Sequence, residues 1–293
     1  MDKSGLILLD KKSGVTSFEA LGEIKRALGT GKVGHTGTLD KFASGLLVVL
    51  SGRALKLSPW FSHCDKQYVG KICFGTETDT LDPEGEKTAE APLPSRENVE
   101  SAIAGLTGDI MQTPPVYSAI HINGKRASAL ARSGETVQMK ERPVSIYRLE
   151  LRSWELPFAE IFVHCSSGAY IRSLARDIAL LTGSKAHLCA LTRTQVAGFK
   201  LEDAQCTAVN KDEISLKPID KAVIRALGLP WIEISPSEAE KIVHGKPLEA
   251  ILNGKPLSST PSAPDFSAAV FSEESLAAVV KKTEGKWKYG CVL

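Results

Sequence analysis

Long hydrophobic runs are absent from this chain of 293 residues. No apolar run approaches the roughly 18 residues that a membrane-spanning helix needs. The apolar patch near the N-terminus, residues 6–9, is too short for the core of a signal peptide, and charged residues follow it at once. We therefore expect a cytoplasmic protein without a membrane segment.

Cysteine is scarce, and its spacing argues against two kinds of site. The six cysteines are scattered along the chain and form no Cys-x-x-Cys pair. In a chain of this length, that pattern favours buried thiols over a disulfide framework or a zinc site. Cys73 and Cys165 lie inside apolar runs typical of strands, which supports the same interpretation. We predict no bound metal.

Complete nucleotide-binding and calcium-binding motifs are also missing. No G-x-x-x-x-G-K-[ST] loop occurs in the sequence. Residues 29–34 match G-x-G-x-x-G, but they follow an expected helix and lead into a loop, whereas a dinucleotide fingerprint follows a strand and opens a helix. Residues 76–86 carry several acids without the spacing or the final glutamate of a calcium loop, so we expect a solvated polar turn there.

Neither sign of charge is in large excess, since the net charge is only +2. Bases outnumber acids in residues 1–60 and again in 117–152, whereas acids prevail between 65 and 113. Charged runs are usually solvated surface, but this alternation indicates one face for a polyanion and another for solvent. The basic, glycine-bearing segment near residues 117–143 suits a mobile flap over a polyanionic ligand.

The elements that the sequence does contain indicate a mixed fold. Apolar segments of strand length alternate irregularly with a few segments of helical periodicity. One helix is marked by Thr16 and Glu19, a capping-box pair, and by Gly29 at its end. Because regular strand–helix alternation is missing, we predict an α+β fold with a mixed, largely antiparallel sheet flanked by helices.

The pattern loosens around residues 211–230, and Gly228-Leu229-Pro230 is typical of a boundary. We therefore expect a larger domain over residues 1–228 and a small β-rich domain over residues 229–293.

The stretch from Gly34 to the apolar run at residues 46–50 is the most informative part of the sequence. It sets Asp40 in a loop of small residues just before an expected buried strand. Gly34, Gly37 and Gly45 allow backbone angles closed to other residues and let a ligand approach. A carboxylate on a tight loop anchored to a rigid strand suits chemistry. An isolated aspartate in such a loop is more often a turn residue, so Asp40 needs support from elsewhere.

Other side chains could meet Asp40 in one cleft. His35 lies on the same loop, Tyr68 lies near the start of an expected strand, and Tyr170 and Arg172 lie at a strand–helix turn. A guanidinium beside Asp40 would favour its charged form and keep it ready as a nucleophile. Tyrosine rings can stack on a flat base, and a buried hydroxyl can relay a proton.

The loop sequence, GHTGTLD at residues 34–40 followed by ASGLL at 43–47, resembles the signature loop of the TruB family of tRNA pseudouridine synthases. Further matches follow in the family's order, and the resemblance covers about residues 5–200. Residues 229–293 resemble the family's PUA-type RNA-binding module only loosely. The further matches are LDK at 9–11 with GVTS at 14–17, DKQY at 65–68, TDTLD at 78–82, PPVYSA at 114–119, GAYIRSL at 168–174, and AHL at 186–188 with Leu191 and Arg193.

The resemblance implies a pseudouridine-synthase-type fold with a PUA-like C-terminal domain. It also implies isomerisation of uridine-55 in the T-arm loop of tRNA, in which the C1′–N1 bond breaks, the base turns and C5 rejoins the sugar. No cofactor is required, because nothing is oxidised or added. Asp40 would be the catalytic aspartate, Arg172 its salt-bridge partner, and Tyr170 the base that takes the C5 proton.

For substrate binding, the resemblance implies that Tyr68 stacks on the uracil and Leu191 lines the uracil pocket. His35 would help to hold the RNA loop opened by base flipping, and Lys11 would support the active site. Extruding a stacked base costs a few kcal/mol, and RNA loops with unstacked bases are the usual targets of specific readers. We expect tRNA to be the only partner and the protein to act as a monomer.

Two residues depart from the family pattern, since Lys12 and Lys41 stand where family members usually carry proline. Losing a ring that fixes φ predicts a looser loop beside Asp40, and Lys41 adds a cation near the RNA backbone.

Two other functions remain open from the sequence. One is a non-catalytic RNA-binding protein or tRNA chaperone in which Asp40 is structural. The other is a guide-dependent synthase of the related eukaryotic and archaeal type, although the chain shows no long basic tails or added partner segments.

Overall fold

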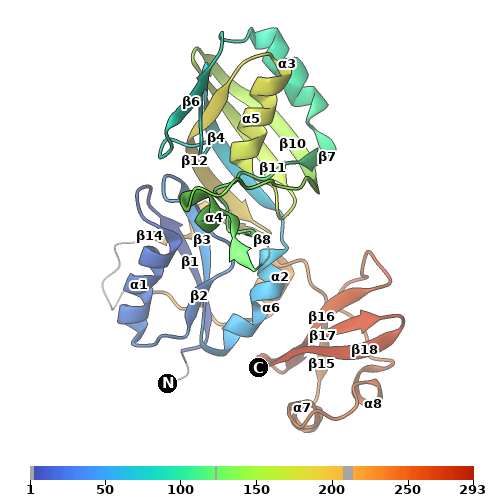
Figure 1. The fold of residues 1–293 in the computed structure, drawn as a ribbon. Helices are drawn as coiled ribbons and strands as arrows, with labels where there is room; N and C mark the ends of the chain where they lie inside the picture. The colour runs from blue at the N-terminus through green and yellow to red at the C-terminus, as the bar shows by residue number, and fades with distance from the viewer. Residues whose placement is uncertain (1–2, 123, 207–213) are drawn as a thin grey trace.

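The computed structural model describes residues 3–122, 124–206 and 214–293. Its larger part is built on a ten-stranded sheet with the order β14-β1-β3-β12-β4-β11-β10-β7, in which β2 pairs with β3 and β13 with β12 (Figure 1). Among the described strands of this sheet, only β1 with β14 and β3 with β12 pair in parallel. The strands are β1 (Gly5–Lys11), β2 (Val33–His35), β3 (Ser44–Ser51), β4 (Lys66–Phe74), β7 (Gly108–Gln112), β10 (Arg142–Glu155), β11 (Phe158–Cys165), β12 (Ala186–Val196), β13 (Phe199–Lys200) and β14 (Gln205–Cys206). The predicted mixed, largely antiparallel sheet is confirmed.

The burial of strand β1 on both faces explains why polar and apolar residues do not alternate in the first apolar run of the sequence. Ile7 and Leu9 point into one hydrophobic core, whereas Leu6 and Leu8 point into a second core on the opposite face. A strand buried on both faces reads as a continuous hydrophobic run. Its neighbour β3 is buried in the same way.

Helices cover the sheet, and the helix predicted near the N-terminus starts and ends where the sequence predicts. The helix α1 (Ser17–Leu28) begins with the expected capping box, in which Glu19 N donates to Thr16 Oγ1 at 3.1 Å and Thr16 N donates to Glu19 Oε2 at 2.8 Å. It ends at Gly29, which has a φ of 61°. The other helices of this part are η1 (Gly52–Leu57), α2 (Ser58–Ser62), α3 (Arg96–Gly105), α5 (Ile171–Leu181), η2 (Leu201–Asp203) and α6 (Lys221–Ala226).

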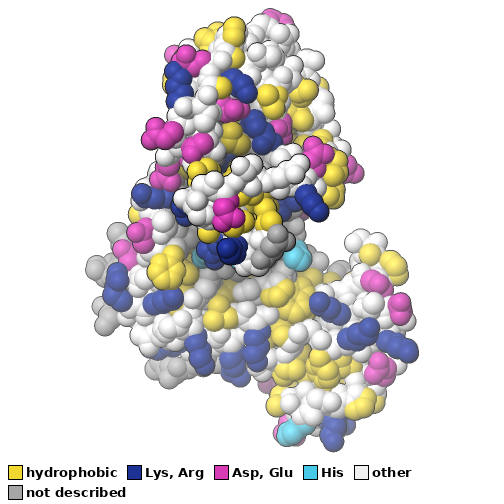
Figure 2. Space-filling model, viewed as in Figure 1, with side chains coloured by type: hydrophobic (Ala, Val, Ile, Leu, Met, Phe, Trp, Pro, Cys, Tyr) yellow, Lys and Arg dark blue, Asp and Glu magenta, His cyan; other side chains and the backbone are white. Residues whose placement is uncertain are grey.

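The segment expected to form a flap carries a small hairpin and a short helix. These are β8 (His121–Ile122), β9 (Lys125–Arg126) and α4 (Ala127–Arg132), and in Figure 1 they cross the middle of the molecule in front of the sheet. Figure 2 shows the same segment as a ridge that carries a few charged side chains.

A separate four-stranded sheet forms the C-terminal part, with the order β15-β16-β17-β18 (Figure 1). Val279 of β17 packs into the second core of the large sheet, and Lys56 Nζ donates to Val292 O at 2.8 Å. The elements are β15 (Trp231–Ile234), α7 (Pro236–Val243), α8 (Glu249–Leu252), β16 (Phe266–Ser272), β17 (Ser275–Thr283) and β18 (Lys286–Val292).

Two predictions about sequence motifs have clear outcomes. The G-x-G-x-x-G match at residues 29–34 follows α1, as expected, but its last two residues lie in β2, so the expectation that it leads into a loop is wrong. The acidic segment is more ordered than predicted, since β5 (Thr76–Thr78) pairs with β6 (Lys87–Glu90) around it.

Cys165 is fully buried, as predicted, and burial raises the pKa of its thiol to about 12. Cys73 is only half-buried. Within the described residues, no helix is long and apolar enough to cross a membrane.

Candidate active site

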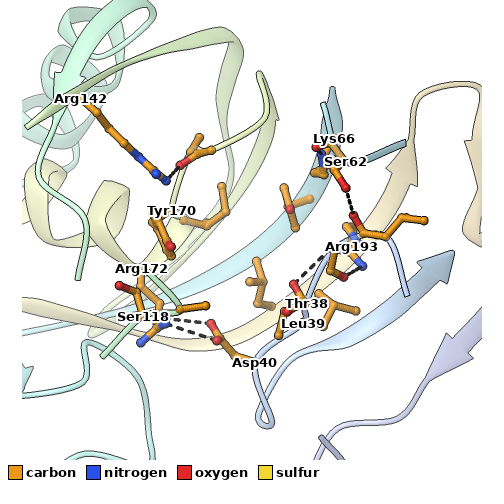
Figure 3. Close-up of a pocket in the computed structure, with 18 residues that line it drawn as sticks. Thr38, Leu39, Asp40, Ser62, Lys66, Ser118, Arg142, Tyr170, Arg172 and Arg193 are labelled. Carbon is orange, nitrogen blue, oxygen red and sulfur yellow. Dashed lines mark hydrogen bonds and ion pairs between the residues drawn. The ribbon is translucent and has the colours of Figure 1, made fainter. Parts of the chain in front are cut away.

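A cavity of about 340 Å³ opens where the loop after β2 meets β4, β12 and the start of α5 (Figure 3). Asp40, Tyr68, Tyr170, Arg172 and Leu191 all line it, although they come from distant parts of the sequence. Five of the seven predicted site residues therefore share one cavity. The other two, His35 and Lys11, lie outside its walls.

The loop that carries Asp40 is fixed from its interior side. Leu39 is buried, and its backbone exchanges hydrogen bonds with Ser17 Oγ at 2.9 and 3.0 Å. Ala43 N donates to Asp40 O at 3.1 Å, which closes a turn directly after the aspartate. The carboxylate is thereby held above a rigid strand, as its place in the sequence predicts.

Lys11 lies behind this loop. It is fully buried, and its Nζ donates to the carbonyls of Val15 and Ala43 at 2.6 Å and of Lys12 at 3.0 Å. Burial lowers the pKa of Lys11 to about 8, and the nearby Asp40 carboxylate opposes that shift. The contacts fit a supporting role for Lys11 toward the loop.

The loosening expected from Lys12 and Lys41 stays a prediction, and the backbone of this loop has several hydrogen bonds. Lys41 O accepts a hydrogen bond from Gly14 N at 2.8 Å, and Ser13 Oγ donates to Phe42 O at 2.7 Å. The side chain of Lys41 is exposed, with its Nζ 3.7 Å from Glu84. Hydrogen bonds therefore hold the loop without a proline ring.

Arg172, the second residue of α5, forms an ion pair with the Asp40 carboxylate. Its Nε lies 2.9 Å from Asp40 Oδ2, and its Nη2 donates to Asp40 Oδ1 at 3.3 Å (Figure 3). The guanidinium lowers the pKa of Asp40, but burial has the larger effect and raises that pKa above its usual value, and the Asp82 carboxylate raises it further. The guanidinium therefore favours the charged form of Asp40, as expected, but burial decides the net direction of the pKa shift.

Asp82 is a site residue that the sequence analysis missed. It is buried and lies 3.2 Å from Arg172 Nη1, so one guanidinium joins two aspartates. Arg172 also donates to Thr80 O at 2.7 Å and to Tyr117 O at 3.0 Å. The prediction of a solvated turn is wrong at Asp82, because the buried guanidinium needs acceptors and takes them from this turn. The TDTLD match at residues 78–82 was the available signal.

Arg193 is a second missed residue, on the other side of the cavity. It lies opposite Tyr68 in the β12–β4 pair, and its guanidinium donates to Leu46 O at 2.7 Å and Gly37 O at 3.0 Å. Burial raises the pKa of the Tyr68 hydroxyl, which keeps it a neutral phenol. Arg193 thus ties the Asp40 loop to the two strands behind the cavity.

Of the three glycines around Asp40, Gly45 uses a backbone angle that other residues rarely adopt. Gly45 has a φ of +102°, and a Cβ there would lie 2.4 Å from Arg193 O. Gly34 and Gly37 have ordinary φ values, so they do not use this freedom. Their lack of a side chain still leaves room, since a Cβ on Gly34 would lie 2.9 Å from Leu55.

Tyr170 occupies the N-cap position of α5 and is fixed through its backbone. The buried Gln112 accepts from Tyr170 N at 2.8 Å and donates to Tyr170 O at 3.2 Å. The Arg142 guanidinium lies 4.9 Å from the centre of the Tyr170 ring, and Figure 3 shows both side chains at the same wall. The ring is therefore positioned from two directions.

His35 faces a second cavity of about 680 Å³, which shares Asp40 and Arg172 with the first. Arg126 and Arg132 of the flap segment also line this cavity. Burial lowers the pKa of His35, which favours its neutral form. Within the part of the chain that is described, no group of three or more His, Cys, Asp or Glu side chains is arranged to hold a metal ion.

Residues 25–171 match the N-terminal domain of the TruB family of pseudouridylate synthases. The chain belongs to this family of isomerases. A protein of Borreliella burgdorferi named tRNA pseudouridine synthase B is 41% identical over 230 residues, which cover 76% of this chain and 82% of that protein. A protein of the same name from Treponema denticola is 46% identical over 224 residues, 70% of this chain, and the match covers 63% of its length.

Among solved structures, the archaeal box H/ACA sRNP Nop10–Cbf5 complex contains a chain of similar fold. The TM-score is 0.71 at 23% identity, and the match covers 100% of this chain and 86% of that chain. The likeness extends over both sheets, so it supports the predicted pseudouridine-synthase fold with a PUA-like C-terminal domain.

Proposed function

We propose that the protein converts uridine-55 in the T-arm loop of tRNA to pseudouridine. The observation that carries the proposal is the Asp40–Arg172 pair on the wall of a cavity that also presents Tyr68 and Tyr170. The names of the two bacterial relatives, which specify tRNA, support the choice of substrate.

In the proposed reaction the target uridine leaves the RNA stack and its base enters the cavity of about 340 Å³. Tyr68 stacks on the uracil and Leu191 lines the pocket. An Asp40 carboxylate oxygen bonds to the sugar as the C1′–N1 bond breaks, and Arg172 keeps this carboxylate oriented.

The base then turns and C5 bonds to C1′, which releases Asp40. Tyr170 takes the C5 proton, and N1 of the product carries a proton in its place. Atoms balance without an oxidant, reductant or added group, so the reaction uses no cofactor.

The surroundings of the cavity fit an RNA loop. Arg126 and Arg132 would face the phosphates beside the flipped nucleotide, with His35 helping to hold the opened RNA loop and Lys11 supporting the catalytic loop from behind. We propose that residues 1–228 form the catalytic domain, with the flap near 117–143, and that residues 229–293 form a PUA-like RNA-binding domain. The protein would act in the cytoplasm as a monomer.

The test is to map pseudouridine in tRNA lacking the modification and in a naked T-arm transcript, after incubation with the pure protein alone. Pseudouridine at position 55 in both RNAs is the expected result. Modification only with added guide RNA or protein would support the guide-dependent type instead. Tight tRNA binding without any pseudouridine would favour the chaperone function.

A further inference from the structure

The side of the cavity away from Asp40 is positively charged. Lys66 and Arg193 both line it, and Figure 3 shows them apart from the Asp40–Arg172 pair. Asp40 is balanced by a guanidinium, whereas no described carboxylate lies within ion-pair distance of Lys66 or Arg193.

Lys66 is the cation of this pair that is able to bind a ligand. The guanidinium of Arg193 donates its hydrogen bonds to the carbonyls of Leu46, Thr38 and Gly37. The ammonium of Lys66 donates to Ser62 O at 3.1 Å and to Cys64 O. An ammonium carries three N–H groups, so one remains for a group in the cavity.

The fold fixes the position of Lys66 at the cavity. It begins β4 only two residues before Tyr68, and its Cε would lie 3.9 Å from a Cβ on Gly37. Burial and the neighbouring Arg193 lower the pKa of Lys66, so an anion that arrives beside it would favour its charged form. A base stacked against Tyr68 would lie next to this ammonium.

The reaction creates such an anion. When the C1′–N1 bond breaks, its electron pair leaves with the base, and the negative charge spreads over N1 and the ring oxygens of uracil. A fixed donor aimed at charge that develops in the transition state lowers the barrier more than one aimed at charge already present.

We propose that Lys66 is a catalytic residue that stabilises the uracil anion formed on cleavage of the C1′–N1 bond. The inference rests on the proposed function and assigns the group that offsets charge on the leaving base, as Asp40 offsets charge on the sugar. The competing explanation is that Lys66 only satisfies the Ser62 and Cys64 carbonyls.

The test compares Lys66→Met and Lys66→Gln with the wild type in single-turnover reactions on T-arm RNA. The RNA carries either uridine or 5-fluorouridine at the target position, and the measured quantity is the nucleoside whose C5 is bonded to C1′. Because isomerisation does not change the mass of uridine, nucleosides of the digests are separated by liquid chromatography before mass spectrometry. Removing one donor to a developing anion typically slows the chemical step by about 100-fold. Because fluorine stabilises the uracil anion, the defect of both variants should shrink by about 10-fold or more on 5-fluorouridine. Lys66→Arg should restore part of the rate.

Lys71→Met is the matched control, since Lys71 lies on the same strand but packs over Phe158 outside the cavity. It should behave as the wild type on both RNAs. An equal defect of the Lys66 variants on both RNAs would overturn the inference in favour of a structural role. An unchanged rate with weaker RNA binding would overturn it in favour of a phosphate contact. An inactive wild type would instead refute the proposed function.

Discussion

The variant Asp82→Asn tests whether the Arg172 guanidinium is bound by two aspartates, Asp40 and Asp82. Asp82 Oδ2 lies 3.2 Å from Arg172 Nη1, while Oδ1 accepts from Thr80 Oγ1 at 2.6 Å and from Glu84 N at 3.0 Å. Asparagine has one oxygen and one amide nitrogen, so one rotamer sets its nitrogen against Arg172 and the other sets it against Thr80 and Glu84. Either way the variant loses a contact of the buried network.

The size of this loss follows from the burial of both partners. A hydrogen bond to a charged group contributes about 1.5–3 kcal/mol, and removing one partner of a buried ion pair costs about 3–5 kcal/mol. We expect Asp82→Asn to lower the free energy of unfolding by about 3 kcal/mol, measured by urea denaturation. The exposed Glu86→Gln variant in the same turn is the control.

The same variant also leads to a prediction about pH dependence, and its sign follows from the charge of Asp82. The negative charge of Asp82 raises the pKa of Asp40, so its removal lowers that pKa. Since the proposed reaction requires the Asp40 carboxylate, the acid limb of the profile of kcat/KM against pH should move to lower pH. An unchanged free energy of unfolding, or an acid limb that moves to higher pH, would refute the reasoning.

Two further changes test how the catalytic loop is held. Gly45→Ala should destabilise the protein by more than about 2 kcal/mol in urea denaturation, because Gly45 has a φ of +102° and a Cβ there would lie 2.4 Å from Arg193 O. Gly31→Ala is the control and should not destabilise the protein, because a Cβ on Gly31 would have no atom within 4 Å. For Lys11 the pKa is lowered from 10.5 to about 8, so the unfolded chain binds more protons between these values. The free energy of unfolding of the wild type should therefore rise between pH 8 and 10.5, relative to Lys11→Met, by up to about 3 kcal/mol. A parallel pH dependence of the two proteins would contradict this.

Much of the fold could be predicted because its signals are local. The capping box at Thr16 and Glu19, the αL residue Gly29 and the apolar run in β3 depend on neighbours along the chain. The order of the strands could not be predicted in the same way, because pairing joins segments that are far apart in the sequence, as β3 and β12 are.

The site could be predicted only in part, because its partnerships span the chain. The resemblance to the family marked Asp40 and Arg172, which the structure places in contact. Asp82 looked like a solvated turn residue, since its burial depends on a guanidinium 90 positions away. The net direction of the Asp40 pKa depends on burial and on Asp82, neither of which can be read from the sequence around it.

The most direct test of the central proposal is tritium release from T-arm RNA labelled at C5 of uridine, with the wild type and with Asp40→Asn. Asparagine keeps the size of the side chain but cannot act as the carboxylate nucleophile. We predict that the wild type releases tritium from position 55 and that Asp40→Asn binds the same RNA without releasing it. Release by Asp40→Asn at the wild-type rate would contradict the assignment of Asp40 as the nucleophile.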